Sequence, residues 1–235
     1  MSEVKGREID IATIDACVFD AYGTLFDTSS AAERCRAGIG AEWQHFAALW
    51  RRKQLEYTWL RSQMGRHTDF WHVTAEALDY AFAASKRSDP QLRAALMQQY
   101  LALAPFPGVA ELLAGLKAAR KQTAILSNGS PTMLTAVVNA AGLARLLDAV
   151  LSIEAVGVYK PHPSVYQLAV ERLGVAASRI LFFSSNGWDA QGAAAFGFRA
   201  VWINRAGDPP EKLPGVLTQT VASIEAVPAL LGLAA

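Results

Sequence analysis

Short apolar runs rich in branched residues recur along the chain and alternate with longer segments in which apolar residues repeat every three or four positions. The short runs are bounded by turns, as is typical of buried parallel strands. They span residues 12–20, 122–127, 149–153, 179–184 and 199–203. The longer segments predict helices over residues 108–120, 131–141, 163–173 and 189–196. This alternation predicts an α/β protein with a doubly wound, Rossmann-like parallel sheet.

One stretch interrupts the alternation. Residues 29–104 have helical composition, with many alanines and aromatics and no convincing strand. Pro105 and Pro107 mark its end, because proline cannot continue a helix interior. We therefore predict a helical cap over residues 29–104, inserted into a core made of residues 1–28 and 105–235. Residues 205–220, which are rich in proline and glycine, are expected to form a loop.

Length and composition fit one sizeable core with an insertion, since the chain has 235 residues, 52% hydrophobic and 18% charged. The formal net charge of +1 provides no long-range attraction for nucleic acid or a membrane surface, so neither is expected as a partner. The first 16 residues lack the apolar block of a secretory signal, and no run reaches the ~18 residues of a membrane span. Cys17 and Cys35 indicate core thiols rather than a disulfide framework. A cytoplasmic protein is expected.

Polar residues follow four of the predicted strands, at residues 20–24, 127–130, 158–161 and 184–189. In an open parallel sheet, the segments beyond the carboxyl ends of the strands converge on one crevice. Each segment alone has an ordinary explanation, such as a turn at Ser127 and Asn128, a solvated loop at Lys160, or a helix start at Asp189. Their shared position in the fold favours a common site.

Asp20 ends the first predicted strand, and Tyr22 stands two residues further on. An aspartate at a strand end is a suitable nucleophile. Phosphoryl-transfer enzymes built on such a segment have a second carboxylate at the position of Tyr22, for a metal ion and for proton transfer. The phenol therefore favours attack of Asp20 on carbon, without a metal ion.

The remaining candidate ligands also argue against a divalent metal ion, which needs several hard oxygen ligands and usually more than one carboxylate. A phosphatase of this fold supplies two acidic groups four residues apart beyond the fourth strand, whereas here Asp189 has Ser185 at that spacing. The four histidines show no helical i,i+4 pair and no cysteine at ligand spacing. They are His45, His67, His72 and His162. Neither a metal ion nor a cofactor is expected.

Five segments of the chain occur in the order of one known pattern, at residues 19–27, 50–57, 126–129, 159–161 with Tyr166, and 184–189. On these segments the chain resembles the haloacid dehalogenase superfamily, and within it the L-2-haloacid dehalogenases, over nearly its whole length. The first and third segments are shared with many phosphatases, so the other three and Tyr22 carry the assignment. The resemblance implies hydrolysis of short (S)-2-haloalkanoic acids to (R)-2-hydroxyacids and halide. It also implies a homodimer.

Attack on the carbon beside a substrate carboxylate would bring two anions together. At ~4 Å and an effective dielectric constant of about 20 they repel by about 4 kcal/mol, which would slow attack roughly a thousandfold. Lys160 is the cation expected beside Asp20, where it keeps the nucleophile ionised. Arg51 is the second expected cation, on a partly apolar face of a helix predicted over residues 41–62, although most such basic runs are solvated.

The mechanism implied by the resemblance has two steps. Asp20 attacks C2 in line and expels halide with inversion, and water then attacks the carbonyl carbon of the resulting aspartyl ester. Asp189 is expected to position or deprotonate that water. The supporting roles fall to Lys160, Ser184 and Asn186, which arrange the network, and to Thr24 and Tyr166, which orient Asp20 and Lys160.

Substrate binding is assigned by the same resemblance. Arg51 and Asn128 are expected to receive the departing halide, while Ser127 and the backbone amides near Ala21 and Tyr22 hold the substrate carboxylate. An apolar wall around the substituent at C2 is expected to exclude water, although simple core packing is the usual role of such residues. Its candidates are Tyr22, Leu55, Phe70 and Trp188.

Two other functions stay open from the residues. A phosphatase or phosphonate hydrolase is supported by Asp20, Ser127 and Lys160, but opposed by Tyr22 and Ser185. A small-acid binding protein that keeps this fold without turnover is the other alternative. Dependence on magnesium would identify the first, and absence of halide release would favour the second.

Overall fold

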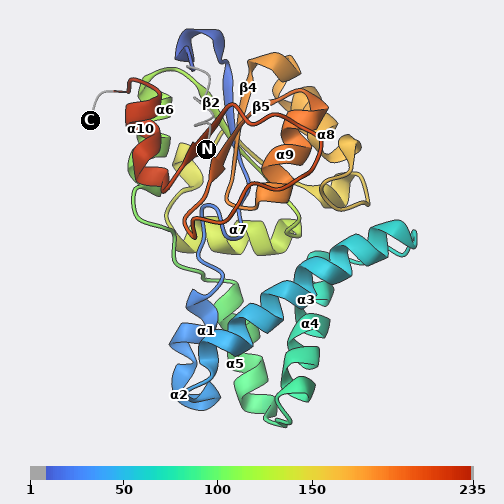
Figure 1. Ribbon diagram of the computed structural model, residues 1–235. Helices are drawn as coiled ribbons and strands as arrows, with labels where there is room; N and C mark the ends of the chain where they lie inside the picture. Colours follow the sequence, from blue (N-terminus) through green and yellow to red (C-terminus); the bar gives the residue numbers. More distant parts are fainter. Residues whose placement is uncertain (1–8, 234–235) are drawn as a thin grey trace.

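The computed structural model describes residues 9–233 and contains a six-stranded parallel sheet with helices on both faces (Figure 1). The strands lie in the order β3-β2-β1-β4-β5-β6. They are β1 Ala16–Phe19, β2 Gln122–Ser127, β3 Ala149–Ser152, β4 Ile180–Ser184, β5 Arg199–Ile203 and β6 Gln219–Val221. The predicted doubly wound fold is confirmed. Half of the first 16 residues, in which no secretory signal was expected, lies outside the described residues, as do residues 1–8 and 234–235 of the predicted core.

The central strand owes its apolar sequence to burial on both faces. Every residue of β1 is buried, and its neighbours β2 and β4 bring Ile125 and Phe183 into register with Phe19. The rings of Phe19 and Phe183 stack with centroids 4.7 Å apart. Helices α6 Val109–Ala118 and α10 Val227–Leu230 cover one face, and α8 Pro163–Leu173 and α9 Gly187–Phe196 cover the other (Figure 1). Strands enclosed in this way read as near-continuous apolar runs.

Helix starts follow local capping chemistry. Helix α7 Pro131–Ala140 follows β2, and the Ser130 side chain accepts a hydrogen bond from the Met133 N–H. Proline at the first helical position loses no hydrogen bond, because that N–H has no partner inside the helix. These signals are readable in the sequence, and the predicted and observed starts of α7 coincide.

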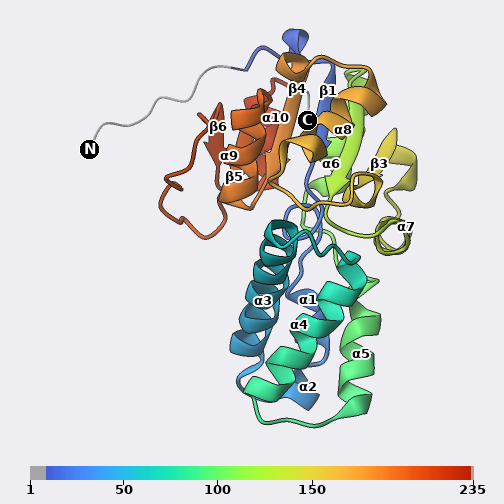
Figure 2. The ribbon, with the colours of Figure 1, turned by 90° about the vertical axis from the view of Figure 1, so that its right-hand side faces the viewer.

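Five helices form a separate group, called the cap below, at the carboxyl end of the sheet (Figures 1 and 2). They are α1 Ser30–Arg34, α2 Arg36–Ile39, α3 Trp43–Gln63, α4 Phe70–Ala84 and α5 Pro90–Tyr100. The chain enters and leaves this group side by side, because the Asp27 N–H donates to the Ala104 carbonyl at 2.8 Å. Aspartates cap two of the helices, since the Asp69 and Asp89 side chains accept from backbone N–H groups at the starts of α4 and α5.

The structure differs from the sequence-based expectation at two places. Within the run at residues 12–20, a 3₁₀ turn at Ile11–Thr13 precedes β1, because the Asp10 side chain caps it by accepting from the Ala12 N–H. The prediction of a loop over residues 205–220 is wrong at its end, where the edge strand β6 begins and pairs with β5. At three residues, that strand is too short for its alternation to be recognised.

Two further observations bear on the cellular context. Cys17 is buried, Cys35 is partly buried, and both are free thiols. Within residues 9–233, no helix combines the length and the apolar character needed to cross a lipid bilayer.

Candidate active site

The four polar segments meet at the carboxyl end of the sheet, on the side that faces the cap. Asp20 continues the ladder one residue beyond β1, since its N–H donates to the Phe183 carbonyl at 2.9 Å. The residue is only 6% exposed. Lys160 connects the other segments to it through contacts with Asp20, Asp189 and Asn128. The convergence expected from strand topology is therefore observed.

The carboxylate of Asp20 is held by three donors. Its Oδ1 accepts from Lys160 Nζ at 3.1 Å, and its Oδ2 accepts from Thr24 Oγ1 at 3.0 Å and Asn186 Nδ2 at 2.9 Å. Asn186 precedes α9 but does not cap it, because its amide points to Asp20 instead. Donors on both oxygens stabilise the negative charge and fix the orientation of the nucleophile.

Lys160 lies between two carboxylates. Its ammonium is 3.1 Å from Asp20 Oδ1 and 2.8 Å from Asp189 Oδ2, and the residue is 1% exposed. Burial by itself would lower the pKa of Lys160, but the negative charges of Asp189 and Asp20 outweigh burial and raise that pKa. Lys160 therefore remains a cation beside the nucleophile.

Asp189 lies in the first turn of α9 and is fully buried. Burial raises its pKa, an effect that the charge of Lys160 opposes and that of Asp20 reinforces. The Tyr166 hydroxyl donates to Asp189 Oδ1 at 2.8 Å. Tyr166 thus orients Asp189, whereas the sequence-based expectation had it orienting Lys160. A glycine is needed for this approach, because a Cβ at Gly192 would lie 2.7 Å from the Tyr166 hydroxyl oxygen.

The polar residues at the ends of β2 and β4 have matching local geometry. The hydroxyls of Ser127 and Ser184 each accept from the backbone N–H two residues later, at 3.1 Å. Each serine therefore keeps its hydroxyl proton for another acceptor. Asn128 Oδ1 accepts from the Lys160 backbone N–H at 3.1 Å, so its Nδ2 is the group that remains to donate. Both Ser127 and Asn128 can thus offer donors to an anion.

Arg51 reaches from the cap to the core. It lies on α3, and its Nη2 donates to the Tyr22 carbonyl at 2.8 Å, while its Nη1 donates to Gln54 Oε1 at 2.7 Å. The guanidinium is therefore bound to the backbone of Tyr22, which is two residues after Asp20 in the sequence. Throughout residues 9–233, no group accepts a hydrogen bond from the backbone N–H of Ala21 or Tyr22. Those amides are free to bind a carboxylate.

Tyr22 is part of a buried aromatic cluster. Its ring centroid lies 5.6 Å from those of Phe70 and Tyr100, and the residue is 2% exposed. A Cβ at Gly129 would lie 2.6 Å from the Tyr22 ring, so only glycine fits at the Ser-Asn-Gly turn. Burial raises the pKa of Tyr22 well above its usual value, so the side chain stays a neutral phenol. Its hydroxyl has no hydrogen-bond partner in the described part of the chain.

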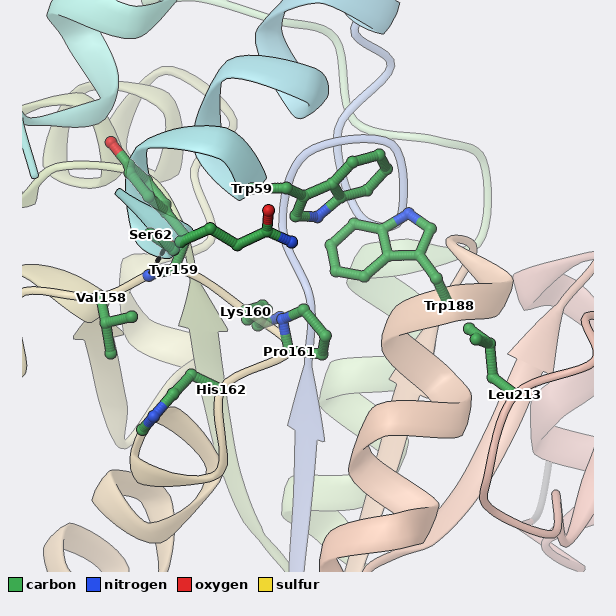
Figure 3. A pocket seen from close by; sticks show the side chains of 10 residues that line it. Trp59, Ser62, Val158, Tyr159, Lys160, Pro161, His162, Trp188 and Leu213 are labelled. Atoms are coloured by element: carbon green, nitrogen blue, oxygen red, sulfur yellow. Dashed lines mark hydrogen bonds between the residues drawn. The ribbon is translucent and has the colours of Figure 1, made fainter. Parts of the chain in front are cut away.

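A pocket of about 540 Å³ opens beside Lys160, between the cap and the core (Figure 3). Trp59 of α3 and Trp188 of α9 meet edge to face there, with centroids 5.2 Å apart. Of the four wall candidates, only Trp188 lines this pocket. The other three do not line it. Tyr22, in the loop after β1, is buried against Phe70 of α4, and Leu55 is partly buried on α3.

No group of three or more His, Cys, Asp or Glu side chains could hold a metal ion in the part of the chain that is described. Ser185, at the spacing where a phosphatase has a carboxylate, bonds instead to the loop after β1. Its N–H donates to Thr24 Oγ1 at 2.8 Å and its hydroxyl donates to the Gly23 carbonyl at 2.6 Å. Ser185 therefore holds in place the segment that carries Asp20 and Thr24.

Sequence reasoning missed several residues that the structure places at the site. They are Gln54, Trp59 and Leu213, and the tethering role of Ser185 was also not foreseen. Gln54 lies one helical turn beyond Arg51, a spacing that could have indicated contact. Leu213 reaches the pocket from the loop between β5 and β6, and no local pattern signals that approach.

Comparisons with known proteins agree with this geometry. Residues 14–197 match the haloacid dehalogenase-like hydrolase family. The chain is 44% identical over 221 residues to (S)-2-haloacid dehalogenase 1 of Pseudomonas sp. (strain CBS-3), covering 93% of this chain and 96% of that protein. It is 46% identical over 202 residues to (S)-2-haloacid dehalogenase 4A of Burkholderia cepacia, covering 86% and 87%.

A solved structure extends the likeness to three dimensions. The L-2-haloacid dehalogenase of Xanthobacter autotrophicus, with chloropropionic acid covalently bound, matches with a TM-score of 0.87. Its sequence is 39% identical, and the match covers 93% of this chain and 98% of that one. By sequence over most of its length, and by fold, this chain belongs to the haloacid dehalogenase-like hydrolase family, in its branch of (S)-2-haloacid dehalogenases.

Proposed function

We propose that this protein hydrolyses short (S)-2-haloalkanoic acids to (R)-2-hydroxyacids and halide, through an ester on Asp20 and with inversion at C2. One observation carries the proposal. The buried Asp20 carboxylate is held by Lys160 at 3.1 Å, and the same ammonium lies 2.8 Å from Asp189. A nucleophile and a second carboxylate that could act as a base thus share one buried cation.

In the first step, Asp20 attacks C2, a carbon–oxygen bond forms and the carbon–halogen bond breaks. The substrate carboxylate binds the Ser127 hydroxyl and the free amides of Ala21 and Tyr22. Halide leaves toward Arg51 and the Asn128 amide nitrogen. Two cations and two carboxylates balance within the site, so the arriving substrate adds a single net negative charge, which these donors stabilise.

In the second step, water attacks the carbonyl carbon of the ester. Asp189 takes one proton from the water and passes it to the alkoxy oxygen as the bond between that oxygen and the carbonyl carbon breaks, so the hydroxyacid leaves. The other proton of the water is released to solvent when Asp20 returns to its carboxylate form. Asp20 is restored with one oxygen atom from water. Lys160 and Asn186 donate to the oxygens of Asp20 and offset the charge that builds up during the addition.

No metal ion or cofactor takes part in this proposal. The Lys160 ammonium occupies the position between Asp20 and Asp189 that a shared cation would need, and it supplies that charge. We assign the wall around the C2 substituent to the four side chains expected from the sequence. They are Tyr22, Leu55, Phe70 and Trp188.

We also propose the wider context of the enzyme. Residues 29–104 act as a cap on the core of residues 1–28 and 105–235, and the protein works in the cytoplasm, where free thiols such as Cys17 and Cys35 persist. Its partners are the haloacid and halide, not nucleic acid or a membrane. A second copy of the chain completes a homodimer, for which exposed apolar side chains on the cap supply a surface.

A single turnover in ¹⁸O-labelled water tests the covalent mechanism. With enzyme in excess over 2-chloropropionate, the label should enter Asp20 rather than the hydroxyacid, because water attacks the ester carbonyl. Mass spectrometry of the peptide that contains Asp20 measures it. Label in the hydroxyacid instead would mean direct attack by water on C2 and would refute the ester.

Asp20→Asn should abolish halide release in the same assay, provided that the intact mass shows no hydrolysis back to aspartate. Asp27→Asn is the matched control, since Asp27 lies on the same segment and its carboxylate bonds to Ser29. Activity of the wild type should be unchanged by a strong chelator. Loss of activity that magnesium restores would support a phosphatase-like site instead.

A further inference from the structure

Gln54 lies at the junction of the three longest cap helices, and it is 1% exposed. Its Oε1 accepts from Arg51 Nη1 at 2.7 Å and from the Tyr100 hydroxyl at 3.0 Å. Its Nε2 donates to Thr74 Oγ1 at 2.7 Å. One amide therefore connects α3, α4 and α5, and one of its partners is the arginine that reaches the active site.

The orientation of this amide is determined by its neighbours. The Thr74 hydroxyl donates to the Phe70 carbonyl at 2.6 Å, so its oxygen can only accept from Gln54. The amide nitrogen must therefore face Thr74, and the amide oxygen must face Arg51 and Tyr100. An arginine has no acceptor of its own, so an oxygen presented at this position is what orders the guanidinium.

Two acceptors then fix the guanidinium from different directions. Gln54 Oε1 holds Nη1 within the cap, and the Tyr22 carbonyl holds Nη2 at the core, two residues from Asp20. A side chain with several rotatable bonds is thereby ordered before substrate arrives. Such preorganised charge is effective in catalysis because it need not be reoriented when the transition state forms.

We propose that Gln54 is a positioning residue for halide displacement, acting through Arg51. This inference rests on the proposed function, in which Arg51 stabilises the departing halide. Gln54 touches neither substrate nor nucleophile. Its contribution is to keep the guanidinium where the negative charge of the leaving group appears, and a small displacement of such a group can cost about a hundredfold in rate.

Four variants test the role. Gln54→Met keeps a buried side chain of similar length but removes the acceptor, and Gln54→Asn keeps an amide that is one methylene too short, in case the first variant fails to fold. Gln54→Glu restores oxygen acceptors for Arg51 and Tyr100, and the Thr74 hydroxyl can turn from the Phe70 carbonyl to donate to the second carboxylate oxygen. Thr58→Val is the matched control, because Thr58 is buried on the same helix and its hydroxyl, among the described residues, bonds only to the Leu55 carbonyl.

Measurements of kcat, KM and chloride inhibition separate positioning from simple stability. We expect kcat on 2-chloropropionate to fall about 10- to 100-fold in Gln54→Met and Gln54→Asn, with KM within about threefold because Ser127 and the backbone amides still hold the carboxylate. Product inhibition by chloride should weaken. Gln54→Glu should recover most of kcat, and Thr58→Val should stay within about twofold of the wild type.

A crystal structure of Gln54→Met or Gln54→Asn supplies a readout that does not depend on activity. The Arg51 guanidinium should lie away from the Tyr22 carbonyl. The inference is overturned if kcat stays at the wild-type value, or if kcat falls while Arg51 keeps its contact with Tyr22. Absence of halide release by the wild type would refute the proposed function itself, a different outcome.

Discussion

At the residue scale, the site depends on small residues as much as on charged ones. Tyr22 can stand over the turn after β2 only because Gly129 has no side chain, and Tyr166 can reach Asp189 only because α9 carries Gly192 there. The first glycine reads from the sequence as an ordinary turn residue. Its actual role is a close approach between two segments more than a hundred positions apart, which no local pattern can indicate.

In the proposed mechanism Asp20 is the nucleophile and Asp189 is the base, and this difference gives a prediction for Asp189→Asn. The amide cannot take a proton from water, so ester hydrolysis should slow by about 10²–10⁴-fold while attack by Asp20 continues. A burst of halide, with one equivalent per enzyme, should precede a slow steady state. Intact-mass spectrometry should then show the enzyme carrying the 1-carboxyalkyl group of the substrate as an ester on Asp20.

The wild type provides the comparison for this variant. Burial raises the pKa of Asp189 above its ordinary value of 3.8, and the base must be deprotonated, so kcat should rise with pH through a limb above that value. The rate at which the ester forms in Asp189→Asn should lack this limb. Slow halide release with no burst would instead place Asp189 in the first step.

At the element scale, strands and their ends could be predicted and most cap contacts could not. The strands β2 and β5 have the predicted bounds, because buried parallel strands impose continuous apolar runs on the sequence. Strand ends then place Asp20, Asn128, Lys160 and Asp189 together through topology alone. No comparable rule predicts which residues of the cap helices approach the site. Which turn of α3 faces the core is decided by packing against α4 and α5.

A hydrogen bond between the cap and the core gives the prediction at this scale. The Tyr159 hydroxyl, from the loop after β3, donates to the Thr68 carbonyl in the α3–α4 loop at 2.5 Å. Tyr159→Phe removes one hydrogen bond, worth about 1 kcal/mol. The melting temperature should fall by about 2–4 °C for a chain of this size, as measured by calorimetry.

Tyr80→Phe is the matched control for that measurement. Tyr80 is an exposed tyrosine of α4, 42% accessible, and its ring, which the phenylalanine keeps, lies 4.5 Å from Lys53 Nζ. The melting temperature of the Tyr80→Phe variant should stay within about 1 °C of that of the wild type. Equal melting temperatures for both variants would show that the contact between Tyr159 and Thr68 does not hold the cap in place.

At the scale of the whole molecule, chemistry is split between two parts of the chain that are distant in sequence. The core supplies the nucleophile, the lysine and the base, whereas the cap supplies Arg51 and its support in Gln54. The sequence indicated Arg51 through a motif but left Gln54 and Trp59 unnoticed. Both interact across helices or across the cap boundary, and such contacts depend on how the parts assemble.

The outer face of the cap gives the last prediction. Leu60 in the last turns of α3 is 45% exposed, Met64 directly after that helix is 69% exposed, and Tyr80 of α4 is 42% exposed. If this apolar patch joins two copies of the chain, a double variant Leu60→Glu, Met64→Glu should weaken the dimer by at least about tenfold per substitution. Sedimentation equilibrium over a range of protein concentrations measures the change.

Activity should survive the loss of the dimer, because every residue assigned to the proposed mechanism comes from one chain. Val216→Glu is the control, since Val216 is 79% exposed and belongs to the loop between β5 and β6 rather than to the cap. Halide release per chain should be similar in all three proteins. A wild type that is monomeric at every concentration would refute the dimer, and an unchanged association constant in the double variant would place its interface elsewhere.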